Sequence, residues 1–229
     1  MDTRIPGSQK VDIPRLEHGD TLPLGEFRRR CAAMPDPKKA ELVEGEVYLP
    51  SSSPPEHGDA HALLGTWLKT YRSRTAHLET RDRASVLLDL DNLLRPDSLL
   101  MIRPGQGGSA RFGENDLIQG APELIAEVAL SRVSLDAWKK PRVYRRSGVR
   151  EFILWRIEDV ALDWFVLRDG RFDPLPPGKD GILRSEVFPG LWLDRDALLR
   201  EDLPRVEAIL GQGIASAEHT AFVDRLNRR

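Results

Sequence analysis

Two short apolar segments that each carry a carboxylate are the feature that most restricts how this chain can fold. Asp97 leads directly into the apolar residues 98–102, and Glu127 interrupts the apolar run 124–130. Runs of this length favour β-strands. A carboxylate is rarely buried unless it is paired or bound to a cation. For each acid alone a simpler interpretation stays open: Glu127 on the polar face of an amphipathic strand, and Asp97 as a turn residue that begins a strand.

The rest of the sequence predicts one mixed α/β domain. We expect an extended lead-in over residues 1–21, a main domain over 22–200 and a helical C-terminal extension over 201–229. The predicted helices cover residues 24–34, 57–71, 136–147 and the tail from 204; the predicted strands cover a hairpin at 40–49 and residues 86–90, 98–102, 124–130, 152–157 and 161–167. The stretch 103–116 is predicted to be a loop, and residues 191–199 are predicted to close the core.

Composition narrows the environment and the partners. The formal charge is −2, from 34 basic and 36 acidic residues, which argues against strong indiscriminate binding to nucleic acid. The single cysteine, Cys31, excludes an intramolecular disulfide and is expected to be a core thiol. The sequence shows no apolar run of roughly 20 residues and no apolar signal core at its start. We therefore expect a cytoplasmic protein with no membrane partner.

Asp97 and Glu127 together predict a metal site. If the two strands are neighbours, both carboxylates lie side by side, and Mg²⁺ is typically held by one or two carboxylates with water and substrate phosphate. Such a cation can polarise a phosphoryl oxygen. Lys139 and Lys140 follow on the next element, where an ammonium group could stabilise developing charge. The spacing alone is a weak signal, and a metal enzyme acting on another phosphate ester stays open.

At this point the sequence resembles the Uma-type restriction endonuclease family of the PD-(D/E)XK nuclease superfamily. The similarity covers roughly residues 22–200 and rests on an ordered set of loose motifs. These are Glu41-Leu-Val-Glu-Gly-Glu46, Pro54-Pro-Glu-His-Gly58, Arg95-Pro-Asp97, Ala121-Pro-Glu-Leu-Ile-Ala-Glu-Val128, Ser131-Arg-Val-Ser-Leu-Asp-Ala-Trp-Lys-Lys140, Val143-Tyr-Arg-Arg-Ser-Gly-Val-Arg-Glu151 and Val187-Phe-Pro-Gly-Leu-Trp-Leu193.

The resemblance implies a restriction-endonuclease-like core, a central mixed sheet flanked by helices, with the active site on two neighbouring strands. It implies Asp97 and Glu127 as ligands of Mg²⁺ or Mn²⁺, Glu41 as an additional acid, and His57 as the family's loop histidine. The superfamily's lysine usually stands two residues after the acid, where this chain has Ala129. In the Uma-type family the lysine lies on the following helix, which implies Lys140.

Pro141 directly follows Lys140 and complicates that helix. A proline inside a helix removes a hydrogen bond and clashes with the preceding turn. The helix predicted from residue 136 must therefore either begin later, near Trp138 or Lys139, or be kinked. Lys139 consequently stays an alternative to Lys140.

Other candidates have simpler explanations. His57 and His61 could pair on a zinc ion, but no third ligand stands nearby and ordinary helix positions explain both. Tyr144 lies one helical turn after Lys140 and is expected to pack, although its hydroxyl could order the site. Residues 139–150 contain six basic residues and no acid, which fits either a solvated helix face or a phosphate contact.

Two classes of function follow. The first is a Mg²⁺-dependent endonuclease that hydrolyses phosphodiester bonds, most simply in DNA, and that could act as a homodimer. The second is a catalytically inactive nuclease-fold module that binds nucleic acid or a protein partner, favoured by the absent Glu-x-Lys lysine and by Pro141. Convergence of Glu41, Asp97, Glu127 and Lys140 in space would argue against the second.

Overall fold

The structure is a computed structural model that describes residues 13–34, 40–49, 55–130 and 135–228. The predicted lead-in over residues 1–21 therefore lies largely outside the described residues. The helices are α1 (Leu24–Ala33), α2 (Pro55–Ser73), η2 (Pro104–Gln106), η3 (Glu114–Asp116), α3 (Leu135–Trp138), α4 (Lys140–Ser147), α5 (Arg195–Leu199), α6 (Leu203–Ile214) and α7 (Ala217–Asn227). The strands are β1 (Glu41–Val43), β2 (Glu46–Tyr48), β3 (Leu78–Asp82), β4 (Val86–Asp89), β5 (Asn92–Leu94), β6 (Ser98–Ile102), β7 (Arg111–Phe112), β8 (Ile118–Gln119), β9 (Leu124–Ala129), β10 (Glu151–Arg156), β11 (Ala161–Arg168), β12 (Arg171–Pro174), β13 (Leu183–Arg184) and β14 (Trp192–Leu193).

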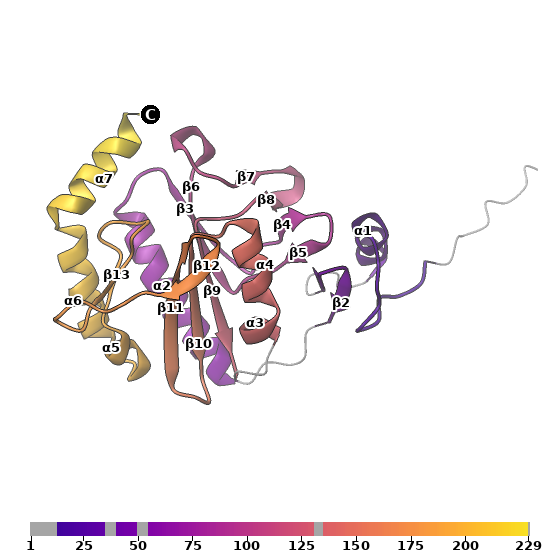
Figure 1. Cartoon of the computed structure of the whole chain (residues 1–229), viewed down its shortest axis with the longest axis horizontal. Coiled ribbons are helices and arrows are strands. Elements are labelled where there is room, and N and C mark those ends of the chain that lie inside the picture. The colour runs from indigo at the N-terminus through magenta and orange to yellow at the C-terminus, as the bar shows by residue number, and fades with distance from the viewer. Residues whose placement is uncertain (1–12, 35–39, 50–54, 131–134, 229) are drawn as a thin grey trace, which may run out of the picture.

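A six-stranded mixed sheet in the order β12-β11-β10-β9-β6-β3 forms the centre of the fold (Figure 1). The pair β9 and β10 is parallel, and the other neighbours are antiparallel. Helix α4 connects the two parallel strands. The register pairs Ser98 of β6 with Ala126 of β9, which brings the start of β6 beside the middle of β9. The predicted mixed α/β fold is confirmed, with the two acid-bearing segments as adjacent strands.

Both faces of β9 are buried, and this decides the direction of Glu127. Leu124, Ala126 and Val128 pack in one hydrophobic cluster with α2, and Ile125 and Ala129 pack in a second cluster with α4. Since side chains alternate along a strand, Glu127 shares the face of Ile125 and Ala129 and points toward α4. Glu127 as a whole is only 1% exposed to solvent. The solvent-facing interpretation of Glu127 is therefore wrong.

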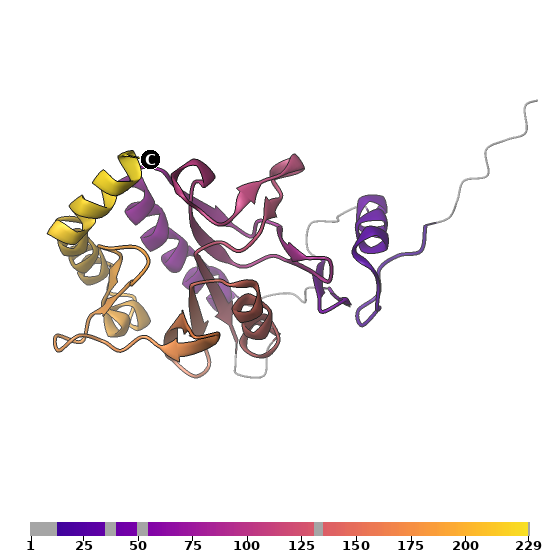
Figure 2. The same ribbon diagram turned by 45° about the horizontal axis from the view of Figure 1, so that its top comes forward.

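A second six-stranded sheet has the order β2-β1-β5-β4-β8-β7 and lies beside the first (Figure 2). The sequence did not predict these strands as one sheet. Its predicted hairpin is confirmed: Glu44 and Gly45 have φ of 54° and 76°, the left-handed conformations of a tight two-residue hairpin turn. Strands β7 and β8 have two residues each, and β7 lies inside the predicted loop 103–116. Elements this short leave no detectable alternation in the sequence.

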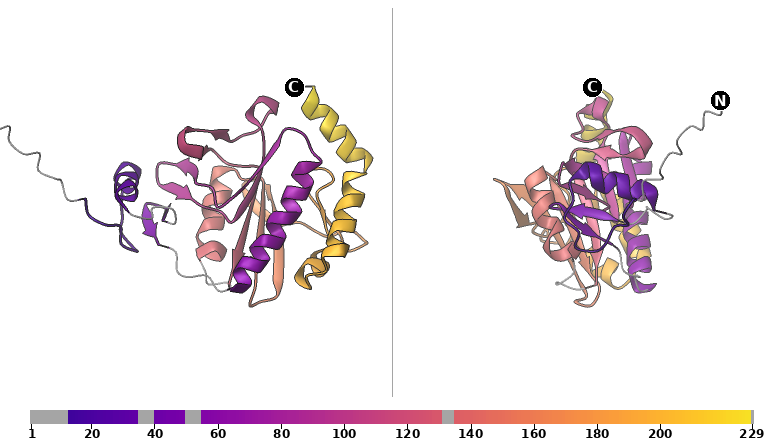
Figure 3. Two further views of the ribbon diagram at one scale, coloured as in Figure 1. Left: turned by 180° about the vertical axis from the view of Figure 1, so that it is seen from behind. Right: turned by 90° about the vertical axis from the view of Figure 1, so that its right-hand side faces the viewer.

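The C-terminal helices α6 and α7 pack into the main core rather than forming a separate unit. Val206, Leu210, Phe222 and Leu226 belong to the same hydrophobic cluster as α2 and the central sheet. Figure 3 shows α6 and α7 beside α2, and Figure 1 places them at the end of the molecule opposite α1 and the β1–β2 hairpin. Within the described ranges, no helix combines the length and apolar character that crossing a membrane requires.

Candidate active site

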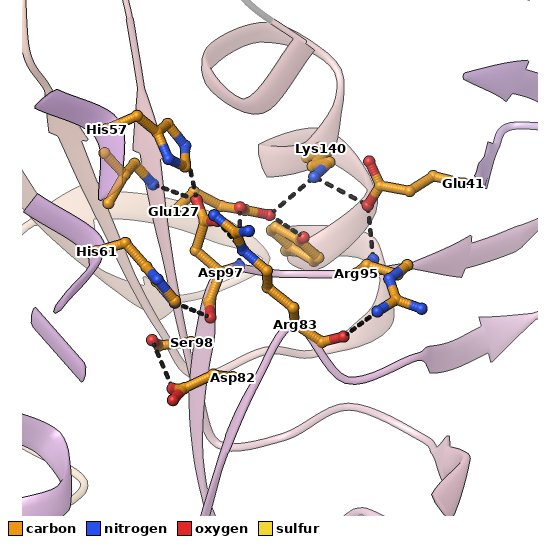
Figure 4. A network of polar contacts seen from close by, with 12 residues as sticks. Glu41, His57, His61, Asp82, Arg83, Arg95, Asp97, Ser98, Glu127 and Lys140 are labelled. Carbon is orange, nitrogen blue, oxygen red and sulfur yellow. Dashed lines mark hydrogen bonds and ion pairs between the residues drawn. The ribbon is translucent and has the colours of Figure 1, made fainter. Parts of the chain in front are cut away.

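The two predicted metal-binding carboxylates lie side by side, Asp97 directly before β6 and Glu127 on β9 (Figure 4). The backbone N–H of Asp97 donates a 3.2 Å hydrogen bond to Oε2 of Glu127. In return, the N–H of Val128 donates a 2.9 Å hydrogen bond to Oδ2 of Asp97. The side chain of Asp97 is 12% exposed and that of Glu127 is 1% exposed. The acid pair therefore meets solvent at Asp97.

His57 contacts Asp97 from the first turns of α2. Its Nε2 lies 3.5 Å from Oδ2 of Asp97, and its Nδ1 is buried without a partner among the described residues. The carboxylate of Asp97 raises the pKa of His57, against the opposing effect of burial. Burial works to raise the pKa of Asp97, but His57 and the Val128 N–H together hold this pKa below its ordinary value. Asp97 is thus ionised despite its burial.

Lys140 lies between two carboxylates. Its Nζ is 2.9 Å from Oε1 of Glu41 on β1 and 3.2 Å from Oε1 of Glu127 on β9. The Lys140 side chain is 3% exposed, so the ammonium group exchanges solvent for carboxylate partners. Glu41 is held in turn by the N–H of Arg95, which donates to its Oε1 at 2.6 Å.

Pro141 is accommodated because the helix predicted from residue 136 is broken into two short helices. Helix α3 ends at Trp138, and α4 begins at Lys140, so the proline occupies the first turn of a new helix. There its missing N–H has no intrahelical acceptor to lose and its fixed φ suits the helix. Because of this break, the side chains of Lys139 and Lys140 point in different directions. Lys139 donates to Oε2 of Glu46 at 2.6 Å and to the hydroxyl of Tyr48, away from the acid pair.

Tyr144 contacts the site one turn after Lys140. Its hydroxyl donates to Oε1 of Glu127, the same oxygen that accepts Lys140. Burial first, and then the charge of Glu127, raise the pKa of Tyr144 well above its ordinary value, so the hydroxyl stays a donor. The ring also packs against Phe152 with 5.6 Å between centroids. Tyr144 therefore packs and orders the site at once.

The basic stretch 139–150 is partly neutralised by neighbouring groups. Lys139 pairs with Glu46, Arg146 lies 2.8 Å from Glu44, and Arg145 donates to the carbonyl of Gly170. The guanidinium of Arg142 stacks over the ring of Trp138 at 4.2 Å. Several of these cations thus already have partners, which leaves fewer of them for the phosphate contact that was one of the two interpretations of this stretch.

The donor set fits a hard divalent cation that keeps several water ligands. Mg²⁺ is typically bound through one or two carboxylates, and Asp97 and Glu127 supply two from adjacent strands. In the part of the chain that the structure describes, no group of three His, Cys, Asp or Glu side chains is arranged to hold a metal ion. The two histidines of α2 contact different groups of Asp97. His57 lies beside its carboxylate, whereas the Nε2 of His61 bonds its backbone carbonyl at 2.8 Å. This arrangement gives no support to a zinc pair.

Sequence reasoning missed two arginines at this site. Arg83 has its Nε 3.6 Å from Oδ1 of Asp97. The guanidinium of Arg95 donates to the carbonyl of Arg83 at 2.6 Å and to Oγ of Ser85 at 3.3 Å. Arg95 precedes Pro96-Asp97 and could have been singled out by that position. Arg83 directly follows β3, a polar strand whose sequence, Leu-Glu-Thr-Arg-Asp, gave no signal.

The comparisons place the chain among restriction-endonuclease-like proteins. The family model described as Uma2, "Putative restriction endonuclease", matches residues 24–196. The chain belongs to this family. The crystal structure of a "putative nuclease belonging to DUF820" from Anabaena variabilis ATCC 29413 has a similar fold, with a TM-score of 0.59 and 14% sequence identity. The similarity covers 78% of this chain and 98% of the other. No curated protein matches the chain.

Proposed function

We propose that this protein is a metal-dependent endonuclease that hydrolyses phosphodiester bonds in DNA. The observation that carries the proposal is the convergence of Glu41, Asp97, Glu127 and Lys140, which come from β1, the start of β6, β9 and α4. Burial of two acids and a lysine beside the partly buried Glu41 costs free energy, and it is expected where the groups perform chemistry. Membership of the Uma2 family supports the same reaction class.

Asp97 and Glu127 would hold the cation, Mg²⁺ or Mn²⁺. When bound, such a cation would polarise a phosphoryl oxygen and lower the pKa of a coordinated water. The chain's own groups have separate tasks. His57 and the Val128 N–H orient the carboxylate of Asp97, and Tyr144 orients that of Glu127.

Lys140 supplies a fixed positive charge beside the acid pair. Its ammonium group can orient a water molecule and stabilise the negative charge that develops when the water oxygen attacks phosphorus and the bond to the leaving oxygen breaks. Glu41 acts as a positioning residue, since it holds Nζ of Lys140 at 2.9 Å. Lys140, on helix α4, would thus take the role of the lysine that the superfamily usually has at the strand position of Ala129.

The test is nicking of supercoiled plasmid and cleavage of single-stranded DNA in Mg²⁺ and in Mn²⁺. The wild type should cleave at least one substrate, and Asp97→Asn should not. Binding without cleavage in either metal would favour the catalytically inactive binding module instead. Equal cleavage by wild type and Asp97→Asn would show that another site carries the activity. The same preparations, run on a sizing column, test the predicted homodimer.

A further inference from the structure

We propose that Arg83 binds the phosphodiester at the mouth of this site, and so is the chain's substrate-phosphate residue. The inference rests on the proposed nuclease function and adds to it the side chain that first contacts substrate. Arg83 follows β3 directly, and its side chain is 50% exposed. Glu127 and Lys140, by contrast, have side chains only 1% and 3% exposed. Arg83 thus offers a positive charge that incoming substrate can reach.

The backbone of Arg83 is held in an unusual conformation by the catalytic segment itself. Its φ is 50°, in the left-handed region that residues other than glycine rarely adopt. Its N–H donates to the carbonyl of Asp97 at 3.1 Å, and its carbonyl accepts from the guanidinium of Arg95 at 2.6 Å. Strained backbone is retained where the surroundings over-determine it, often at functional sites. Here the residues on either side of Pro96 fix the position from which Arg83 extends.

The two oxygens of Asp97 face different partners. Oδ2 faces His57 and the Val128 N–H, on the buried side, and Oδ1 faces Nε of Arg83 at 3.6 Å. Among the described residues, the Arg83 side chain has its ion-pair contact with Asp97 through Nε, and its terminal Nη1 and Nη2 groups make no hydrogen bond. A guanidinium with these donors available suits the two oxygens of a phosphodiester, which it can bind with paired hydrogen bonds.

The charge balance points to the same ligand. Glu41, Asp97 and Glu127 carry three formal negative charges, and Lys140 carries one positive charge. A divalent cation on the acids would offset the remaining two. The guanidinium groups of Arg83 and Arg95 add positive charge beyond this balance, which suits an anionic ligand such as a phosphodiester.

The test compares Arg83→Gln and Arg83→Lys with Arg81→Gln. Arg81 lies two residues earlier, within β3, and pairs with Glu79 at 2.8 Å, so its replacement removes the same charge from a neighbouring position without touching Asp97. Binding of fluorescein-labelled single-stranded and duplex oligonucleotides is measured by anisotropy, in EDTA and in Ca²⁺, as a function of salt. Circular dichroism and thermal melting confirm that each variant is folded.

We expect Arg83→Gln to weaken binding by about ten- to a hundredfold. Its plot of log affinity against log salt should be shallower by about 0.7 to 0.9, the equivalent of one lost phosphate contact. Arg83→Lys should keep the slope but bind more weakly than wild type, because an ammonium group lacks the paired donors. Arg81→Gln should bind within about twofold of wild type.

Equal binding by Arg83→Gln and wild type, or equal losses in Arg83→Gln and Arg81→Gln, would overturn the role of Arg83. Tighter binding of Mn²⁺ by Arg83→Gln, with unchanged oligonucleotide affinity, would show that Arg83 only covers Asp97 and would overturn it as well. If the wild type cleaves DNA in these cases, the proposed nuclease function survives. A wild type that neither binds nor cleaves any oligonucleotide removes both.

Discussion

The backbone N–H of Asp97 donates to the side chain of Glu127, and one residue further along β9 the N–H of Val128 donates to the side chain of Asp97. Each acid of the pair is therefore held by the strand that carries the other. This reciprocal bonding follows from the register of β6 against β9 and fixes both carboxylates before any cation arrives. Preorganisation of this kind reduces the cost of assembling charged ligands around a metal ion.

Glu127→Gln should remove most of the metal affinity while keeping the shape of the side chain. We expect Mn²⁺ affinity to fall at least tenfold and cleavage to fall by about a hundredfold or more. Calorimetric titration with Mn²⁺ measures the first effect and plasmid nicking the second. Glu123→Gln is the matched control, because Glu123 is equally buried but bonds the N–H groups of Ile102 and Ser109. Loss of Mn²⁺ binding in both variants would point to general unfolding.

Lys140→Met and Lys139→Met should differ sharply. Lys140→Met leaves the buried carboxylate of Glu127 and the partly buried one of Glu41 without their shared cation. We therefore expect a loss of about 3 kcal/mol in the free energy of unfolding, together with loss of cleavage. The side chain of Lys139 is 30% exposed, and its replacement should cost less than about 1 kcal/mol and leave cleavage within about twofold. Urea unfolding and nicking assays measure both. Loss of cleavage in Lys139→Met but not in Lys140→Met would contradict the assignment of Lys140 as the catalytic lysine.

Much of this site could be predicted from the sequence, because its acids stand out locally. Asp97 and Glu127 are charged residues beside or inside apolar strands, and that contrast is visible without a structure. The direction of the Lys140 side chain could not be predicted, because it depends on the helix break between Trp138 and Lys140. The sequence left two alternatives there, a later start of the helix or a kink.

Arg83 could not be predicted, because it reaches the site through strand pairing between segments distant in the chain. The preceding strand β3 pairs with β6, which places Asp82 opposite Ser98 and brings Arg83 to Asp97. The sequence of β3 does not alternate between apolar and polar residues, so it does not stand out as a strand. Its polar side chains form ion pairs in the structure, as Glu79 does with Arg103. The second sheet was missed for a related reason, since its short strands depend on tertiary contacts.

Tyr144→Phe should test whether the hydroxyl orders Glu127. The change removes one donor from a buried carboxylate oxygen, so we expect the free energy of unfolding to fall by about 1 to 3 kcal/mol. Cleavage should fall by about tenfold, with little change in KM, because Lys140 still holds the same oxygen. Tyr48→Phe is the control, since the Tyr48 hydroxyl contacts Lys139 outside the acid pair. Unchanged kcat in Tyr144→Phe would leave the tyrosine only a packing role.

Glu151→Gln should change how stability depends on pH, independently of the candidate site. Burial raises the pKa of Glu151, although Ser185 and the N–H groups of Glu186 and Val187 donate to its carboxylate and partly oppose this rise. A carboxyl group whose pKa is higher in the folded protein binds more protons when folded. Its contribution to stability is therefore complete below its unfolded-state pKa, about 4.5, and is lost as the pH rises through the raised value.

Glutamine stays neutral at every pH, can accept from the same N–H groups and can donate to Ser185. We therefore expect the variant to match wild type near pH 4 and to be more stable at pH 8, by about 1.4 kcal/mol for each unit by which the pKa is raised. Urea unfolding from pH 4 to pH 8 measures the difference. Glu186→Gln is the control, because that side chain is 46% exposed and pairs at the surface with Arg168, so its curve should run parallel to wild type. A parallel curve for Glu151→Gln would mean that Glu151 titrates alike in the folded and unfolded chain.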